Sequence, residues 1–169
     1  MKSNFFEKAC PQCLQPNCCR RGITAAEVLI AISVLVILAL ITFPRLSDMR
    51  ETQALKNAEE ETVSMLHDAK SRSLASVNSS EYGVHFDPDK VIIFTGKTYN
   101  PNASDNVVTS LVSPASITNV TLGGVSSSSG DLYFERLTGI PSQAGSITIS
   151  NSSSSKVVSI SVTGAISVN

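Results

Sequence analysis

A single carboxylate stands within the longest apolar stretch of the sequence. Glu27 is the only ionisable side chain in residues 23–43. A charged side chain at the centre of a bilayer costs about 2.5–3.5 kcal/mol on insertion scales, and less near an end. A plain uncleaved membrane anchor would explain the apolar stretch, but it gives no reason for a carboxylate there. We therefore expect Glu27 to have a function.

Four cysteines form a second group with possible chemistry, and all of them precede residue 23: Cys10, Cys13, Cys18 and Cys19. They superficially resemble a zinc ligand set, although the short gap between the pairs leaves no room for a zinc finger or ribbon. Two interpretations stay open, namely transient metal or redox chemistry and an unstructured leader that is discarded. Without these residues the chain has no thiol, so its stability must come from packing and sheet hydrogen bonds.

No catalytic pattern is visible in the remaining sequence. It has no phosphate-binding glycine loop, and its two histidines, His67 and His85, each stand alone. Asp87 and Asp89 flank Pro88, and we expect them to serve a turn rather than a cation. We therefore predict that the protein is not an enzyme, with no catalytic residue, no cofactor and no metal site.

The segment RRGITAAEVLI at residues 20–30 resembles the class III signal of type IV prepilins. Basic residues, a glycine, a hydrophobic residue followed by threonine, and a glutamate five residues after the glycine coincide at fixed spacing. The resemblance implies that a prepilin peptidase cleaves between Gly22 and Ile23 and that Ile23 is then N-methylated. A glycine also lets a protease approach the backbone closely. Two positions depart from the usual signal, since Ile23 replaces phenylalanine and two alanines replace a leucine-rich pair.

The same resemblance implies that residues 23–43 form a filament core and that Pro44 kinks the helix. Cleavage would also give Glu27 a role, because it creates an amino group at Ile23 that is costly to bury unless a carboxylate meets it. Glu27 lies one helical turn away and could pair with its own terminus or with that of a neighbouring subunit. In the family the second pairing registers incoming subunits. The alternative is a half-exposed glutamate without a role.

Residues 23–43 are also long enough to cross a bilayer, since 21 helical residues rise about 31 Å. Arginines precede the stretch, whereas those after it are offset by acidic residues, which places the N-terminus in the cytoplasm. We expect a single-pass inner-membrane protein with residues 1–22 as a cytoplasmic leader and a periplasmic or extracellular C-terminal domain. The expected partners are prepilin peptidase, other pilin or pseudopilin subunits, an inner-membrane assembly platform, and membrane lipid before assembly. A cleaved secretory signal would have a shorter apolar region.

Residues 46–77 contain no glycine or proline and predict a helix. Apolar residues recur at steps of three and four and give a narrow stripe: Leu55, Ala58, Thr62, Met65 or Leu66, and Ala69. We assign residues 44–77 to an amphipathic helix whose stripe packs on the sheet that follows.

After residue 80 the apolar period changes to two. Residues 82–86 and 90–94 predict a hairpin around the turn at residues 87–89. Further strands are expected at residues 116–122, 131–137, 146–150, 157–162 and 165–168, with serine-rich loops at residues 126–129 and 152–155. The predicted fold class is α+β, in which a long N-terminal helix, with a membrane half and an amphipathic half, packs on one antiparallel sheet domain at residues 78–169.

This strand pattern, together with the N-terminal signal, looks like that of the H-type minor pseudopilins, the GspH/FimT family. The resemblance implies a structural minor pilin or pseudopilin of a type II secretion pseudopilus or a type IV pilus. The alternative is a DNA-binding minor pilin of a competence pilus. Residues 78–169 carry four basic and six acidic side chains, so DNA is an unlikely partner, because phosphate binding needs clustered Lys and Arg.

Overall fold

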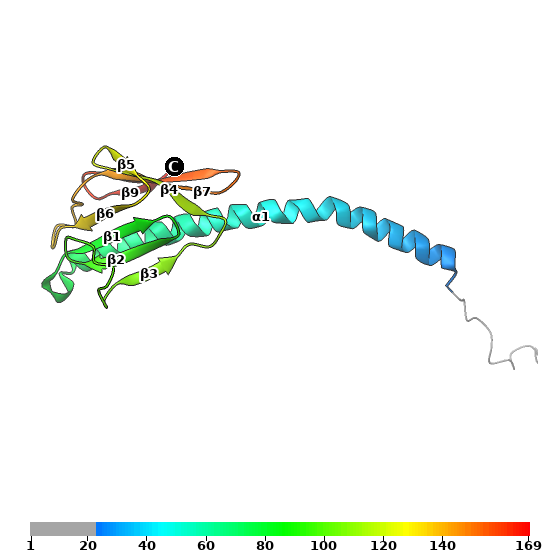
Figure 1. The fold of residues 1–169 in the computed structure, drawn as a ribbon, viewed down its shortest axis with the longest axis horizontal. Helices are drawn as coiled ribbons and strands as arrows, with labels where there is room; N and C mark the ends of the chain where they lie inside the picture. Colours follow the sequence, from blue (N-terminus) through cyan, green and yellow to red (C-terminus); the bar gives the residue numbers. More distant parts are fainter. Residues whose placement is uncertain (1–22) are drawn as a thin grey trace, which may run out of the picture. The chain divides into compact units, whose positions relative to one another are not determined.

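A computed structural model describes residues 23–169, apart from the side chains of residues 42–47. Gly22, the four cysteines and the rest of the expected leader lie outside these residues. The described residues divide into two units, one that ends at Phe43 and one that comprises Pro44–Asn169. One long helix, α1 (Ala25–Leu74), belongs to both units (Figure 1). Its first part, residues 25–43, lies in the first unit, and its second part, residues 44–74, lies in the second.

The structure contradicts the predicted transmembrane segment. Within residues 23–169, and setting aside the undescribed side chains, no helix is both long enough and apolar enough to cross a membrane. The predictions of a single-pass inner-membrane location and of a membrane-spanning half of the helix are therefore wrong.

The second part of α1 is an amphipathic helix that buries one stripe. The whole predicted stripe is buried: Leu55, Ala58, Thr62, Met65, Leu66 and Ala69. Thr62 is tolerated there because its hydroxyl donates to the carbonyl oxygen of Ala58 at 2.7 Å. The helix ends at Leu74, three residues before the predicted end. Ser76 adopts a left-handed conformation, and a short 3-10 helix, η1 (Val77–Ser79), follows.

The predicted hairpin is confirmed as β1 (Tyr82–Asp87) and β2 (Lys90–Thr95), paired antiparallel with Tyr82 opposite Thr95 and Asp87 opposite Lys90. These strands form the centre of sheet A. Its edges are β3 (Val107–Ser110) beside β2 and β6 (Gly130–Phe134) beside β1. Alternation sends Val84 and Phe86 to the core face and His85 to the opposite face.

Sheet B contains the other described strands in the order β5, β4, β7, β8, β9, and all its pairs are antiparallel. The strands are β4 (Ser116–Leu122), β5 (Val125–Ser127), β7 (Gly145–Ser150), β8 (Ser155–Ile160) and β9 (Ile166–Val168). The pairing of β4 with β7 shifts between Ile117 and Asn119. This irregularity lets Ile117 and Val120, three residues apart, both face the core.

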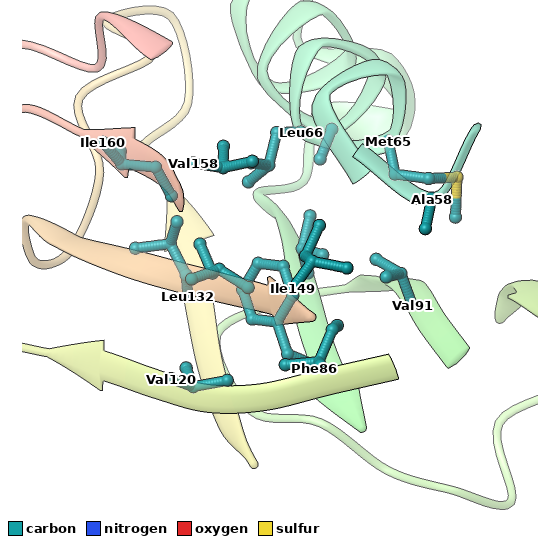
Figure 2. Packing of buried hydrophobic residues seen from close by; sticks show 14 of the residues in the cluster. Ala58, Met65, Leu66, Phe86, Val91, Val120, Leu132, Ile149, Val158 and Ile160 are labelled. Carbon is teal, nitrogen blue, oxygen red and sulfur yellow. The ribbon is translucent and has the colours of Figure 1, made fainter. Parts of the chain in front are cut away.

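One hydrophobic core joins the second part of α1 to both sheets (Figure 2). Leu66 and Met65 enter it from the helix, Phe86 and Leu132 from sheet A, and Ile149 from sheet B. Figure 2 shows these side chains pointing toward one another from the three elements. The described residues therefore form two antiparallel sheets, whereas one sheet was predicted from the sequence. The correction has a simple cause, because β1 pairs with β6 and β4 pairs with β7, so the strands divide between two ladders.

Candidate assembly site

The N-terminal turn of α1 places Glu27 by a helix cap. Thr24 precedes the helix, and its hydroxyl oxygen accepts a hydrogen bond from the backbone N–H of Glu27 at 3.2 Å. The carbonyl oxygen of Thr24 accepts one from the N–H of Val28, also at 3.2 Å. Threonine followed three residues later by glutamate is the capping-box spacing, and an acidic side chain in the first turn also suits the helix dipole. The local sequence thus explains why the helix starts here.

Beyond this cap, the first part of α1 carries large apolar side chains that are exposed on every face. Leu29 is 68% exposed and Leu40 70% exposed. The others in the described stretch are Val28, Ile30, Ile32, Val34, Leu35, Val36, Ile37, Leu38 and Ile41. A folded monomer rarely leaves a continuous apolar surface of this length in water, so such a surface marks an interaction site.

The Glu27 side chain itself is exposed. Among the described residues, its carboxylate has no hydrogen bond or ion pair. A carboxylate without a partner at one end of an apolar helix can meet a cation supplied by another chain, or by a new amino terminus at Ile23. Ile23 is the first described residue, is 75% exposed and precedes the helix.

Not every predicted site residue can be placed. Gly22 lies outside the described residues, and Pro44 belongs to residues 42–47, whose side chains are not described. Cleavage after Gly22, methylation of Ile23 and a kink at Pro44 stay predictions. Of the predicted residues, the structure brings Ile23 and Glu27 to one end of one helix.

The prediction that His85 stands alone was wrong. Its Nδ1 atom makes a hydrogen bond with the Asp131 carboxylate, and its Nε2 atom lies 3.1 Å from Oδ1 of Asp87. Its ring stacks on Tyr99 with centroids 4.0 Å apart. The alternation of residues 85 and 87 along one strand could have indicated the contact with Asp87. The contact with Asp131 depends on the pairing of β1 with β6. In the part of the chain described here, no cluster of His, Cys, Asp or Glu could hold a metal ion.

Comparison of the chain with family models, with characterised proteins and with solved structures gives no match. The function is therefore inferred from the sequence signal at residues 20–30 and from the exposed apolar helix.

Proposed function

We propose that this chain is a structural subunit of a pilin-like filament, of the kind found in type II secretion pseudopili and type IV pili. In this proposal a prepilin peptidase shortens the precursor after Gly22. The apolar part of α1, residues 25–41, then packs against the same part of other subunits. The β-rich unit, residues 78–169, stays outside the packed helices.

One observation carries the proposal. Residues 25–41 form a helix with exposed large apolar side chains on every face, and the single carboxylate in its first turn has no partner among the described residues. Packing identical helices side by side would remove this surface from water at roughly 25 cal/mol per Å² of apolar area. Such a bundle would also bury the amino group of Ile23, and Glu27 would supply the opposite charge one turn away.

The β-rich unit supports a structural role more than a DNA-binding role. Each of its basic side chains after residue 80 is engaged with a carboxylate or a carbonyl oxygen. Lys90 lies 3.6 Å from Asp87, Lys97 lies 3.7 Å from Glu81, and Lys156 lies 3.9 Å from Glu59. Arg136 donates to the carbonyl oxygen of Ser79 at 3.2 Å. Scattered and engaged cations of this kind form a poor phosphate-binding surface.

Processing is tested by intact-mass measurement of the protein from cells that also make a prepilin peptidase. The expected product begins at Ile23. The control is Gly22→Val, whose branched side chain obstructs the approach of the protease to the backbone and should leave the chain full length. An unshortened wild-type product, or cleavage beyond residue 43, would rule out processing at Gly22.

Assembly is tested by Glu27→Gln, with Glu60→Gln as the matched control on an exposed part of the same helix. Leaving one charge of a buried pair without its partner costs about 3–5 kcal/mol. The Glu27→Gln variant should therefore be cleaved normally but recovered with sheared filaments about 100-fold less than wild type. Glu60→Gln should behave as wild type. Equal recovery of all three proteins would show that Glu27 is not an assembly residue.

A further inference from the structure

The outer face of sheet A, which points away from the core, carries a row of polar and apolar side chains that neighbour one another across three strands. Asp131 on β6 is opposite His85 on β1, which is opposite Ile92 on β2. Ile92 and Phe94 are each only 2% exposed, yet neither belongs to the main core. Their burial on the outer face therefore needs a separate explanation.

Part of that cover comes from the connection between β2 and β3, residues 96–106. Tyr99 in this connection lies against Phe94, with ring centroids 5.7 Å apart, and stacks on His85 with an interplanar angle of 12°. Phe94 lies over Gly83, where an added Cβ would come within 2.3 Å of the ring. Phe94 is thus held between Gly83 beneath it and Tyr99 beside it.

His85 is the residue that links this connection to the sheet. Its side chain is 14% exposed and lies between two carboxylates, with Asp131 at Nδ1 and Asp87 at Nε2. The Asp131 contact is a hydrogen bond, whereas the Asp87 contact is an ion-pair distance of 3.1 Å. A protonated ring carries a charge that both carboxylates attract, and it has an N–H on each nitrogen, whereas a neutral imidazole has only one N–H. The two carboxylates therefore favour the charged ring.

The other charged groups named here have partners of their own and do not take the place of the charged His85 ring beside Asp131. Lys90 pairs with Asp87 at 3.6 Å and leaves Asp131 to His85. Farther along the face, Lys97 pairs with Glu81 and lies over the ring of Tyr133, so these groups engage one another. Tyr99 also favours the charged ring, because a cation over an aromatic face is attracted to it.

We propose that His85 is a proton-operated clamp, which in its charged form holds residues 96–106 against the outer face of sheet A. Loss of the proton removes the charge that attracts both carboxylates, and with it the cation–aromatic attraction to Tyr99. The connection then opens more often and uncovers Phe94. This property is independent of the proposed filament role, since it belongs to the β-rich unit alone.

The test is hydrogen exchange on the full chain, kept in solution with a mild detergent, at pH 5.5 and pH 8.0. Protection factors divide out the intrinsic effect of pH on exchange. The informative amides are Gly96, which donates to the carbonyl oxygen of Glu81 at 2.8 Å, and Ala103, which donates to that of Asn100 at 3.2 Å. The ordinary pKa of histidine lies between these two pH values. Protection in residues 96–106 should fall about tenfold at pH 8.0, the factor expected for losing one interaction with a charged group.

The sequence has two histidines, which supplies a matched control. His85→Gln should show low and pH-independent protection in this segment, whereas His67→Gln, changed at an exposed position on α1, should keep the wild-type fall. A wild-type protein whose protection in residues 96–106 is the same at both pH values would overturn the proposal, as would an undiminished fall in His85→Gln. If His85→Gln does not fold, the titration of the wild-type His85 ring is followed by NMR. The Tyr99 ring signals must move with it, and a Tyr99 signal that stays constant while His85 titrates would equally contradict the clamp.

Discussion

The two parts of α1 have the same backbone conformation and opposite relations to water. In residues 25–41 the apolar side chains surround the helix and are exposed, whereas in residues 54–69 they form one stripe that lies in the core. A stripe can be covered by one partner surface, and this chain supplies that surface with its own two sheets. A helix that is apolar on every face needs partners all round it, which the chain's own described residues do not provide. The contrast agrees with the proposed function, in which the second part takes part in folding and the first part in association.

The largest effect that would sharpen this contrast is expected from the same substitution made in each part. Leu66→Ala removes a fully buried side chain from the core and should lower the free energy of unfolding by about 2–5 kcal/mol. Leu29→Ala removes an exposed side chain and should change it by no more than about 0.5 kcal/mol. Urea unfolding of the two full-length variants measures the difference. Equal losses of stability would mean that residues 25–41 also belong to the folded core.

A second substitution tests how tightly the β-rich unit is closed. A Cβ added at Gly145 would lie 2.0 Å from the carbonyl oxygen of Thr121 on the neighbouring strand. Because backbone must move to admit it, Gly145→Ala should destabilise the protein by about 1–3 kcal/mol. Ser146→Ala, on the next residue of the same strand, should stay within about 0.5 kcal/mol of wild type. Similar thermal unfolding midpoints for the two variants would contradict the packing described for this edge.

A smaller effect is expected where the turn between β7 and β8 holds α1 near the start of the buried stripe. The hydroxyls of Ser152 and Ser153 both donate to Oε2 of Glu51, at 2.5 and 3.0 Å. These two hydrogen bonds lower the pKa of Glu51 below its ordinary value. A lowered pKa in the folded state means that this contribution to stability is fully present above the ordinary glutamate range. It is lost as the pH falls through the folded-state value.

Thermal unfolding from pH 7 to pH 3 checks this sign. Glu51→Gln should be less stable than wild type at pH 7, and the difference should shrink toward the acid end. The control is Glu60→Gln, on the solvent side of the same helix, whose difference from wild type should be small and constant. A difference for Glu51→Gln that grows with acidity would show that the two serines do not hold the ionised carboxylate.

The smallest effect concerns nucleic acid, for which we expect none. The charged residues beyond residue 77 are more often acidic than basic, and the basic ones are engaged with neighbours. A fluorescence anisotropy titration of the full chain with double-stranded DNA at near-physiological salt should therefore show no binding at micromolar protein. Salt-sensitive binding at that concentration would favour the competence-pilus alternative and weaken the division of roles between the two parts of α1.

Elements with a strong local pattern were predicted well. The hairpin of β1 and β2 follows from period-two alternation around an Asp-Pro-Asp turn, and β4 was placed with its observed bounds. Two short strands were missed. β3 is a four-residue edge strand whose only ladder is with β2, and β5 lies partly in a serine run that was taken for a loop. Gly123 and Gly124, both with positive φ, make the two-residue turn that pairs β5 with β4, and this signal was available in the sequence.

The predicted membrane span was wrong, since among the residues with described side chains no helix is both long enough and apolar enough to cross a membrane. Glu27 was singled out because one carboxylate among apolar neighbours is visible without any coordinates, and its role stays a prediction. Its helix cap on Thr24 was equally readable from the Thr-x-x-Glu spacing, although the sequence analysis did not use it.

The sequence by itself determined which faces are apolar, because helical and strand periods are local properties of the chain. It thereby fixed the buried stripe of α1, the core face of β1 and the all-round apolar character of residues 25–41. Only the tertiary structure decided how the strands divide into two sheets, and it alone brought Asp131 against His85 across 46 positions of sequence. Strand pairing joins distant residues through backbone hydrogen bonds, and these bonds are the same whatever side chains the residues carry. Which strands become neighbours therefore depends on the packing of the whole core around the helix.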